Sequence, residues 1–338
     1  MSSTQKIPEL WRLIQSHRVT AVIYVAAKLG IAELLRDRPL HVSELAQATA
    51  TNEQALSRLL IALSTIGICE VAGEDRFSIT EMGAGLDGDS ERSFKAWAIL
   101  ESQLLSNSWG GMLDSIRTGK TAAELQGVGN SFDLMARSPE IVSIFNAAMA
   151  ELTRFVTPGI LDSYDFGKIA HLMDAGGGSG ELIAAIARQY PHIRGSVFDL
   201  ARCAEAATRH LGRMGVGDRI RFLAGDFFQT ISPGADAIIM KSILHDWNDE
   251  RSSVILRNCH HALPADGTLL VVERIMPDSP EISDEHREQA MSDLNMLRGP
   301  GGLERTEKQY RRLLDEAGFR QVTIHPAGLF SVIEARIG

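Results

Sequence analysis

The sequence has few cysteines, few aromatic residues and no excess of positive charge. Among its 338 residues there are 3 cysteines, aromatic residues make up 6%, and the formal net charge is −9. Cys69, Cys203 and Cys259 lie far apart, in no pattern typical of a disulfide framework or a metal site. The acidic balance disfavours nucleic acid or an anionic membrane as a partner, because both are bound through basic surfaces.

Long hydrophobic runs, internal repeats and low-complexity tracts are also lacking. No uninterrupted apolar run reaches the length of a membrane span, and residues 1–11 lack the charged-then-apolar pattern of a signal peptide. We therefore expect a cytoplasmic protein with no membrane partner. The remaining composition, 44% hydrophobic and 23% charged, is that of a globular chain long enough for more than one domain.

The first part of the chain, residues 1–92, has the pattern of helices followed by a hairpin. Apolar residues over 10–29 predict a helix that is buried against another surface, such as a second subunit. A helix that begins near Val42, with Ser43 as its cap, and a helix over 51–64 precede strands at 68–71 and 76–79. This is a winged helix-turn-helix outline. The second helix offers only Arg58 as a basic residue, which favours a structural role over DNA binding.

Residues 93–160 predict mainly helical structure, over 93–113 and 131–161. Phe145 and Met149 lie one helical turn apart on an apolar face of the second stretch. Taken alone, such a pair is more typical of a core than of a ligand pocket.

The stretch around a glycine cluster organises the rest of the chain. An apolar run over 169–173 predicts a buried strand, Gly176, Gly177 and Gly178 follow it, and an amphipathic helix begins near Leu182. Glycine is needed where a backbone turns sharply and a ligand approaches it, and the helix start presents free N–H groups. Tight turns that bind no ligand use glycine too.

Acidic residues end two further strands. Asp199 ends the second strand. Its distance in sequence from Asp174 is near the spacing of about 20 residues at which such an acid reaches ribose hydroxyls. The third strand ends in Asp226 and Phe227, which offer a carboxylate and a ring to an adenine, although Asp226 alone could simply cap a turn. The compact glycine run after Asp174 differs from the glycine pattern that binds the pyrophosphate of a dinucleotide. It therefore favours S-adenosylmethionine over NAD.

Candidate catalytic groups follow the fourth and fifth strands. His245 lies just beyond the strand over 237–240, where the ligand crevice of an open α/β sheet is found. Glu273 ends the next strand, and Glu304 precedes a helix, where it could merely favour the helix start. A histidine with two carboxylates has the parts of an oriented general base.

Together these motifs resemble those of the class I S-adenosylmethionine-dependent O-methyltransferases, the group that includes plant caffeate methyltransferase and bacterial secondary-metabolite enzymes. The motifs occupy residues 174–180, 225–228, 244–247, 271–273 and 301–306. The resemblance implies a Rossmann-like α/β methyltransferase domain with a mostly parallel seven-stranded sheet, and a helical, winged-helix-like N-terminal domain used for dimerisation. The expected division is 1–92 for dimerisation, 93–160 as a helical connector that contributes to the acceptor pocket, and 161–338 for S-adenosylmethionine binding and catalysis.

The resemblance also implies the roles of individual residues. His245 would be the general base for in-line methyl transfer to a phenolic hydroxyl, with Glu273 and Glu304 flanking it and no metal. The acceptor pocket would be lined by Phe145, Met149, Asp293, Asn295 and Met296, which overrides the core assignment of the first two. Cofactor contacts would come from Asp174, Gly176, Gly178, Asp199, Leu200, Asp226, Phe227 and Lys241.

Two positions depart from the family pattern, and other functions stay open. Ala201 replaces a frequent proline near the adenosine, and Gly299 replaces an asparagine common in plant relatives, which leaves the ring substituents of the acceptor open. Some relatives use the cofactor in hydroxylation or decarboxylation, but they usually lack the base. An NAD-dependent oxidoreductase and a ligand-sensing regulator are the alternatives from other classes.

Overall fold

The computed structural model describes residues 3–135 and 137–337, which form two compact units. Unit 1 comprises the residues up to Trp109 together with Ser138–Leu152, and unit 2 comprises Gly110–Arg137 and the residues from Thr153 onward. The expected division at residues 92 and 160 stays a prediction, and both units take residues from its middle segment.

Unit 1 has the predicted winged-helix outline. Its three-stranded antiparallel sheet has the order β1-β3-β2, and Leu45, Leu60 and Leu63 are fully buried in its core. The elements up to the hairpin are α1 (Ser3–Leu29), α2 (Ile31–Leu34), β1 (Leu40–His41), α3 (Val42–Thr49), α4 (Glu53–Thr65), β2 (Cys69–Gly73) and β3 (Arg76–Ile79).

The predicted cap of α3 is wrong by two residues. His41, not Ser43, is the N-cap: its ring accepts the backbone N–H of Ser43, and the side chain of Glu44 accepts the backbone N–H of His41. The short strand β1 carries His41 into this position, because His41 pairs with Arg76 of β3.

The segment predicted as two long helices is more broken than its apolar pattern indicates. A π-helical turn, η2 (Glu101–Leu105), interrupts the first stretch, and the second is divided between two helices, with residues 137–138 outside both. The elements are η1 (Gly83–Leu86), α5 (Lys95–Leu100), α6 (Ser106–Gly110), α7 (Met112–Thr118), α8 (Ala122–Leu125), α9 (Ser131–Met135) and α10 (Pro139–Ser163).

Unit 2 is built on the expected mostly parallel seven-stranded sheet, in the order β11-β12-β8-β7-β4-β5-β6. All neighbouring pairs from β8 to β6 are parallel, whereas β12 is antiparallel to both of its neighbours. The strands are β4 (His171–Ala175), β5 (Arg194–Asp199), β6 (Ile220–Ala224), β7 (Ala237–Lys241), β8 (Thr268–Glu273), β11 (Phe319–Ala327) and β12 (Phe330–Ile337).

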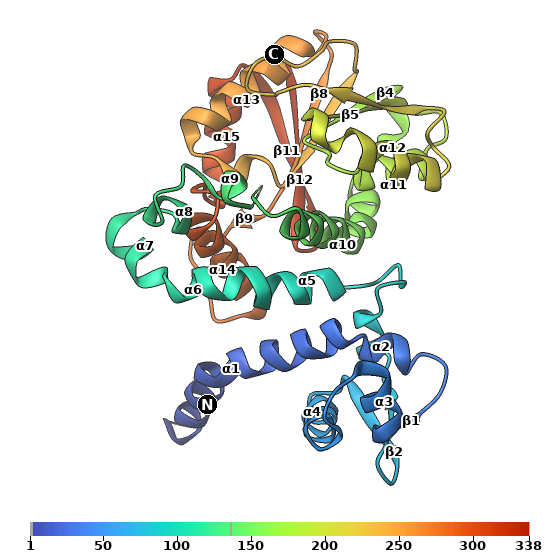
Figure 1. The fold of residues 1–338 in the computed structure, drawn as a ribbon. Helices are drawn as coiled ribbons and strands as arrows, with labels where there is room; N and C mark the ends of the chain where they lie inside the picture. The colour runs from blue at the N-terminus through green and yellow to red at the C-terminus, as the bar shows by residue number, and fades with distance from the viewer. Residues whose placement is uncertain (1–2, 136, 338) are drawn as a thin grey trace. The chain divides into compact units, whose positions relative to one another are not determined.

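Helices cover both faces of this sheet (Figure 1). Helices α11 (Glu181–Gln189) and α12 (Ala204–Arg213) lie on one face, and α13 (Asp249–Ala262) and α15 (Glu307–Glu316) lie on the other. Strands buried on both faces need continuous apolar sequence, and Leu269, Leu270, Val271 and Val272 of β8 are all fully buried.

Smaller elements complete unit 2. Two short strands, β9 (Ile275–Met276) and β10 (Arg305–Thr306), pair in parallel, and α14 (Asp284–Arg298) lies between them in the chain. Short 3₁₀ turns are η3 (Phe166–Lys168), η4 (Ala201–Cys203) and η5 (Leu244–Asp246).

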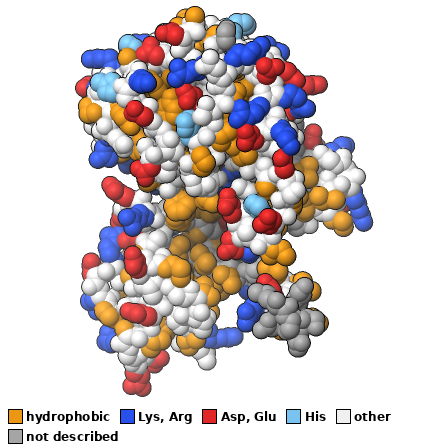
Figure 2. Space-filling model, turned by 180° about the vertical axis from the view of Figure 1, so that it is seen from behind, with side chains coloured by type: hydrophobic (Ala, Val, Ile, Leu, Met, Phe, Trp, Pro, Cys, Tyr) orange, Lys and Arg blue, Asp and Glu red, His pale blue; other side chains and the backbone are white. Residues whose placement is uncertain are grey.

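The surface mixes charges of both signs. Lys and Arg side chains are interspersed with Asp and Glu on the face that Figure 2 shows. Of the helices in the described residues, none has both the length and the apolar character needed to cross a membrane.

Candidate active site

The strand order brings the predicted cofactor residues to one edge of the sheet. Strands β7, β4, β5 and β6 are successive neighbours and run parallel, so their carboxyl ends lie side by side. The backbone N–H of Gly176 donates to Phe198 O at 2.8 Å, and that of Gly225 donates to Asp199 O at 2.9 Å. The loops that leave these strands are therefore fixed to one another. In open α/β sheets this edge is where ligands bind.

Two glycines of the loop, Gly176 and Gly177, pack too closely on their surroundings to accept side chains. A Cβ at Gly176 would lie 2.4 Å from Ile243 Cδ1, and the φ of Gly176 is +75°. A Cβ at Gly177 would lie 2.6 Å from the carboxylate of Asp174. The strand, turn and helix predicted from the sequence are confirmed, and α11 begins directly after Gly180.

Asp174 is a buried acid with an unsatisfied oxygen. Its side chain is 2% exposed, and among the described residues Oδ2 has no hydrogen-bond partner. Burial raises the pKa of Asp174 to about 7, although the nearby charge of Lys241 opposes the shift. A buried oxygen without a donor costs about 1–3 kcal/mol, which suits a ligand that brings a donor or a positive charge.

Asp199 ties two of these loops together. Its Oδ2 accepts the backbone N–H of Gly178 at 2.8 Å, and its Oδ1 accepts the backbone N–H of Leu200 at 2.6 Å. The carboxylate thus lies against the glycine loop, as a ribose-binding acid would, but its contact with a ribose stays a prediction. Leu200 is 38% exposed beside it.

Asp226 and Phe227 have different surroundings. The carboxylate of Asp226 accepts the backbone N–H of Phe228 at 2.9 Å and the Gln229 amide at 3.3 Å, so it does cap a turn. The ring of Phe227 lies 3.4 Å from the position that a Cβ of Gly176 would take. The structure therefore brings Phe227 to the glycine loop, while an adenine contact by Asp226 stays a prediction.

Lys241 ends β7 beside the glycine loop. Its Nζ lies 3.1 Å from Ser242 Oγ and 5.5 Å from the centre of the Phe330 ring. Burial lowers the pKa of Lys241 to about 8, and the charges of Glu273 and Asp174 oppose the shift. The charges of Lys241 and Asp174 thus affect the pKa values of both side chains.

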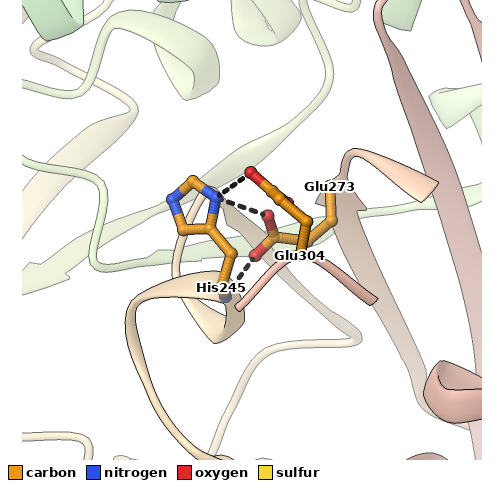
Figure 3. Close-up of side chains that lie close together, drawn as sticks. All are labelled: His245, Glu273 and Glu304. Atoms are coloured by element: carbon orange, nitrogen blue, oxygen red, sulfur yellow. Dashed lines mark hydrogen bonds and ion pairs between the residues drawn. The ribbon is translucent and has the colours of Figure 1, made fainter. Parts of the chain in front are cut away.

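His245, Glu273 and Glu304 come together from three elements, as Figure 3 shows. His245 lies in η5, Glu273 ends β8, and Glu304 precedes β10. The Nδ1 atom of His245 lies 3.0 Å from Glu304 Oε1 and 3.5 Å from Glu273 Oε2. All three side chains are buried. The sequence-based grouping of these residues is thus reproduced by the geometry.

Glu273 also fixes the backbone that carries His245. Its Oε1 accepts the backbone N–H groups of Ile243 at 2.9 Å, Leu244 at 2.8 Å and His245 at 3.3 Å. A carboxylate is one of the few groups that can accept several N–H donors at once. Glu273 therefore orients the loop, whereas Glu304 makes the shorter contact with the ring.

The carboxylates decide the charge of His245. Burial alone would lower its pKa, but Glu273 and Glu304, with a smaller contribution from Asp246, outweigh burial and raise the pKa to about 9. The pKa of Glu304 shifts in the opposite direction. Burial raises it, but His245 and Ser292 outweigh burial and lower it below the ordinary value. In the free protein the ring is thus mainly protonated at neutral pH.

The same three side chains could also hold a metal ion. Each offers one ligand atom, and these atoms lie within 4.8 Å of one another. The Nδ1 to Oε1 distance of 3.0 Å is also that of a hydrogen bond.

Of the predicted acceptor residues, three lie on α14 in unit 2. Asp293 Oδ1 accepts the backbone N–H of Glu304 at 2.9 Å, so Asp293 contacts the segment that carries Glu304. Met296 is 6% exposed, and Asn295 Oδ1 accepts a hydrogen bond from Arg298. Their contact with an acceptor stays a prediction.

Phe145 and Met149 lie in the part of α10 that belongs to unit 1. Both side chains are half-buried, unlike Ala148 between them, which is fully buried. Their acceptor role stays a prediction.

Two residues that contact this site were not predicted from the sequence. Ser292 donates to Glu304 Oε1 at 2.7 Å, and Arg305 lies fully buried beneath the loop of His245. Arg305 follows Glu304 directly, and its complete burial, rare for an arginine, is not visible in a charged sequence pattern.

Comparison with known proteins finds similarity to O-methyltransferases over nearly the whole chain. A family model described as an O-methyltransferase domain matches residues 109–320, and a model of an O-methyltransferase dimerisation domain matches residues 11–86. Phenazine O-methyltransferase PhzM of Lysobacter antibioticus is 37% identical, with 97% of this chain and 95% of that protein covered.

Two further proteins are similar over most or all of their lengths. O-demethylpuromycin-O-methyltransferase of Streptomyces alboniger is 36% identical, with 96% of this chain and 87% of that protein covered. The crystal structure of human N-acetylserotonin methyltransferase in complex with S-adenosylmethionine matches with a TM-score of 0.90 at 27% identity, covering 100% of both chains.

Proposed function

The chain belongs to the S-adenosylmethionine-dependent O-methyltransferases, and from this premise we propose that it methylates a hydroxyl group of a small aromatic metabolite. S-adenosylmethionine is the methyl donor of this family, and a solved relative carries it. The phenazine specificity that one relative's name states supports a flat aromatic acceptor.

The observation that carries this proposal is the contact between His245 Nδ1 and Glu304 Oε1 at 3.0 Å. When the ring is neutral, this contact keeps the proton on Nδ1 and leaves the lone pair on Nε2 to accept a proton. His245 lies beyond the carboxyl end of β7, next to the edge that would hold the cofactor. A base at this place can act on a hydroxyl bound beside the methyl donor.

The residues along the sheet edge fit S-adenosylmethionine. The unpaired Oδ2 of Asp174 and the close glycine turn at Gly176 suit a ligand with donor groups and a positive charge. When bound, S-adenosylmethionine supplies an electrophilic methyl group for in-line transfer. The contacts would come from the eight residues Asp174, Gly176, Gly178, Asp199, Leu200, Asp226, Phe227 and Lys241.

The raised pKa of His245 matches the task of a base for phenols. A phenol has a pKa of about 10, and the conjugate acid of His245 has a pKa of about 9, so the proton moves between groups of similar basicity. The carboxylates of Glu273 and Glu304 stabilise the imidazolium that forms. The chain then needs no metal ion to activate the hydroxyl.

The dimerisation domain supports a homodimer. Helix α1 exposes large apolar side chains to solvent in the single chain, among them Leu10, Trp11 and Ile14, each more than half exposed. Exposed apolar surface of this kind typically marks a protein–protein interface.

The test of the function is turnover with S-adenosylmethionine and a panel of aromatic hydroxy compounds. S-adenosylhomocysteine and the mass of the product are followed together, before and after dialysis against a chelator. We expect a mass gain of one methyl group on a hydroxyl, unchanged by the chelator. Cofactor binding combined with hydroxylation or decarboxylation of the aromatic compound would contradict methyl transfer, and loss of turnover on chelation would contradict metal independence.

The role of His245 is tested by substitution. His245→Ala should lower kcat by about 10²- to 10⁴-fold, the usual contribution of a general base, while S-adenosylhomocysteine still binds in calorimetry. His261→Ala, at an exposed position of α13, is the matched control and should keep wild-type turnover. Near-normal turnover of His245→Ala with intact cofactor binding would refute the assignment.

A further inference from the structure

Three consecutive residues of one segment contact the loop that carries His245. The backbone N–H of Leu303 donates to His245 O at 2.9 Å, and Glu304 contacts the imidazole. Arg305, the third residue, reaches the carbonyl groups on either side of His245. The approach is so close that a Cβ at Gly302 would lie 2.0 Å from His245 O.

Arg305 makes the most contacts of the three. Its Nη1 donates to Leu244 O at 2.8 Å, and its Nη2 donates to Trp247 O at 2.7 Å. The side chain is 0% exposed. Burying a cation away from water carries a large desolvation penalty, which these hydrogen bonds offset only while the guanidinium keeps its place.

The carboxylate of Glu273 binds backbone N–H groups of the loop, and the guanidinium of Arg305 binds its carbonyl oxygens. Glu273 accepts backbone N–H groups of residues 243–245, and Arg305 donates to the carbonyls of Leu244 and Trp247. Each charged group meets the end of the peptide dipole that attracts it. The backbone on both sides of His245 is therefore fixed independently of the contact that Glu304 makes with the ring.

Arg305 is itself held in place. Its Nε donates to Asp249 Oδ1 at 3.0 Å, and its Nη2 lies 3.3 Å from Ser252 Oγ, both on α13. Its backbone pairs with Ile275 in the two-stranded sheet of β9 and β10. The side chain of Arg305 thus connects α13 and β10 to the loop of His245. These contacts leave the loop little freedom to shift.

We propose that Arg305 is a positioning residue for methyl transfer: it fixes the backbone around His245 so that the imidazole keeps its place between Glu304 and the acceptor hydroxyl. The inference rests on the proposed function, since it requires His245 to be the base. Arginine suits the role because its planar fork donates several hydrogen bonds in fixed directions. Lysine could satisfy one carbonyl but not hold the two in a fixed geometry.

The experiment compares substitutions of Arg305 in two backgrounds. Arg305→Met and Arg305→Lys are made in the wild-type protein and in His245→Ala, and kcat and S-adenosylhomocysteine affinity are measured for each. Arg312→Met is the matched control, because Arg312 pairs with Asp249 at 2.8 Å but is 57% exposed and does not contact the loop. The control should keep wild-type kcat.

In the wild-type background we expect kcat to fall about 100-fold in Arg305→Met and less in Arg305→Lys, with cofactor affinity unchanged. In His245→Ala the same substitutions should change kcat by less than about twofold, because residues that act as a unit are not additive. If Arg305→Met does not fold, Arg305→Lys alone makes the comparison.

Two results would overturn the inference. Equal losses of kcat in both backgrounds would show that Arg305 acts without His245, and a matching loss of cofactor affinity would show a general structural role. Near-normal turnover of His245→Ala is a different failure: it would refute the proposed function and not the contacts of Arg305.

Discussion

The protonation of His245 links activity to pH. Its pKa of about 9 in the folded chain lies above the ordinary value of 6.5, so the ion pair with Glu304 stabilises the fold fully below pH 6.5. That stabilisation is lost as the pH rises through about 9. The neutral ring that the proposed mechanism requires appears over the same interval, so activity should rise as this part of the stability is lost.

The pH dependence of turnover is therefore our prediction at the residue scale. In the wild-type protein kcat/KM should rise with pH, reach half of its maximum near pH 9 and level off above that pH. Glu304→Gln should move this rise to lower pH, because it removes a negative charge that raises the pKa of His245, and should lower the plateau because the ring is less well oriented. The measurement is a pH profile of kcat/KM.

Glu288→Gln is the control for this profile, since Glu288 is an exposed acid that pairs with Arg274 at 3.5 Å and does not contact His245. Its profile should match that of the wild-type protein. A Glu304→Gln profile with an unmoved midpoint would show that Glu304 does not set the pKa of His245.

The sequence predicted the residues with chemical signatures and missed those whose role depends on burial. His245, Glu273 and Glu304 follow strand ends or precede a helix, and such positions can be read from periodicity. Arg305 has no such signal, because only the folded chain shows that its side chain is enclosed by the loop of His245 and α13. Asp226 shows the opposite case, since the turn-capping contact considered from the sequence is the one observed.

Among the elements, the turn between β4 and α11 depends most strictly on its sequence. Gly176→Ala should weaken cofactor binding and destabilise the fold by about 1–3 kcal/mol, because the new methyl group would lie 2.4 Å from Ile243 Cδ1 and the φ of +75° disfavours a side chain. Thermal unfolding and calorimetry with S-adenosylhomocysteine measure both effects.

Gly212→Ala is the control for the turn. Gly212 lies in α12, its φ is not positive, and a Cβ there would meet nothing within 4 Å. Alanine in a helix should leave binding unchanged and raise stability slightly. Wild-type cofactor affinity in Gly176→Ala would mean that the close approach of loop and β7 does not shape the binding edge.

Element boundaries were predictable where one local rule acts alone. The hairpin of β2 and β3 and the strand of the glycine loop follow their turn residues and apolar periodicity. The cap of α3 was wrong because strand pairing of His41 with Arg76, a contact distant in sequence, places the helix start. The π-helical turn η2 interrupts a segment whose apolar pattern is continuous, since hydrophobic periodicity does not distinguish π from α turns.

At the scale of the whole molecule, the proposed homodimer makes a prediction for α1. The double substitution Leu10→Glu and Ile14→Glu should shift the protein toward monomer, because it places charges on exposed apolar positions. Sedimentation velocity measures the change. Arg12→Glu, between them in the chain, introduces a negative charge without removing an apolar side chain and should remain dimeric. An unchanged dimer in the double variant would place the interface elsewhere.

The position of Glu304 in the chain also has a consequence for the order in which the protein is made. Glu304, whose carboxylate contacts His245, lies 59 residues after it in the chain. Arg305 lies 61 residues after Leu244, whose carbonyl oxygen it contacts. A growing chain that has emerged only as far as β8 contains the whole edge from Asp174 to Lys241, but not the segment that holds the imidazole. In the proposed function, the residues expected to bind the methyl donor therefore precede in the chain those that would hold the base in place.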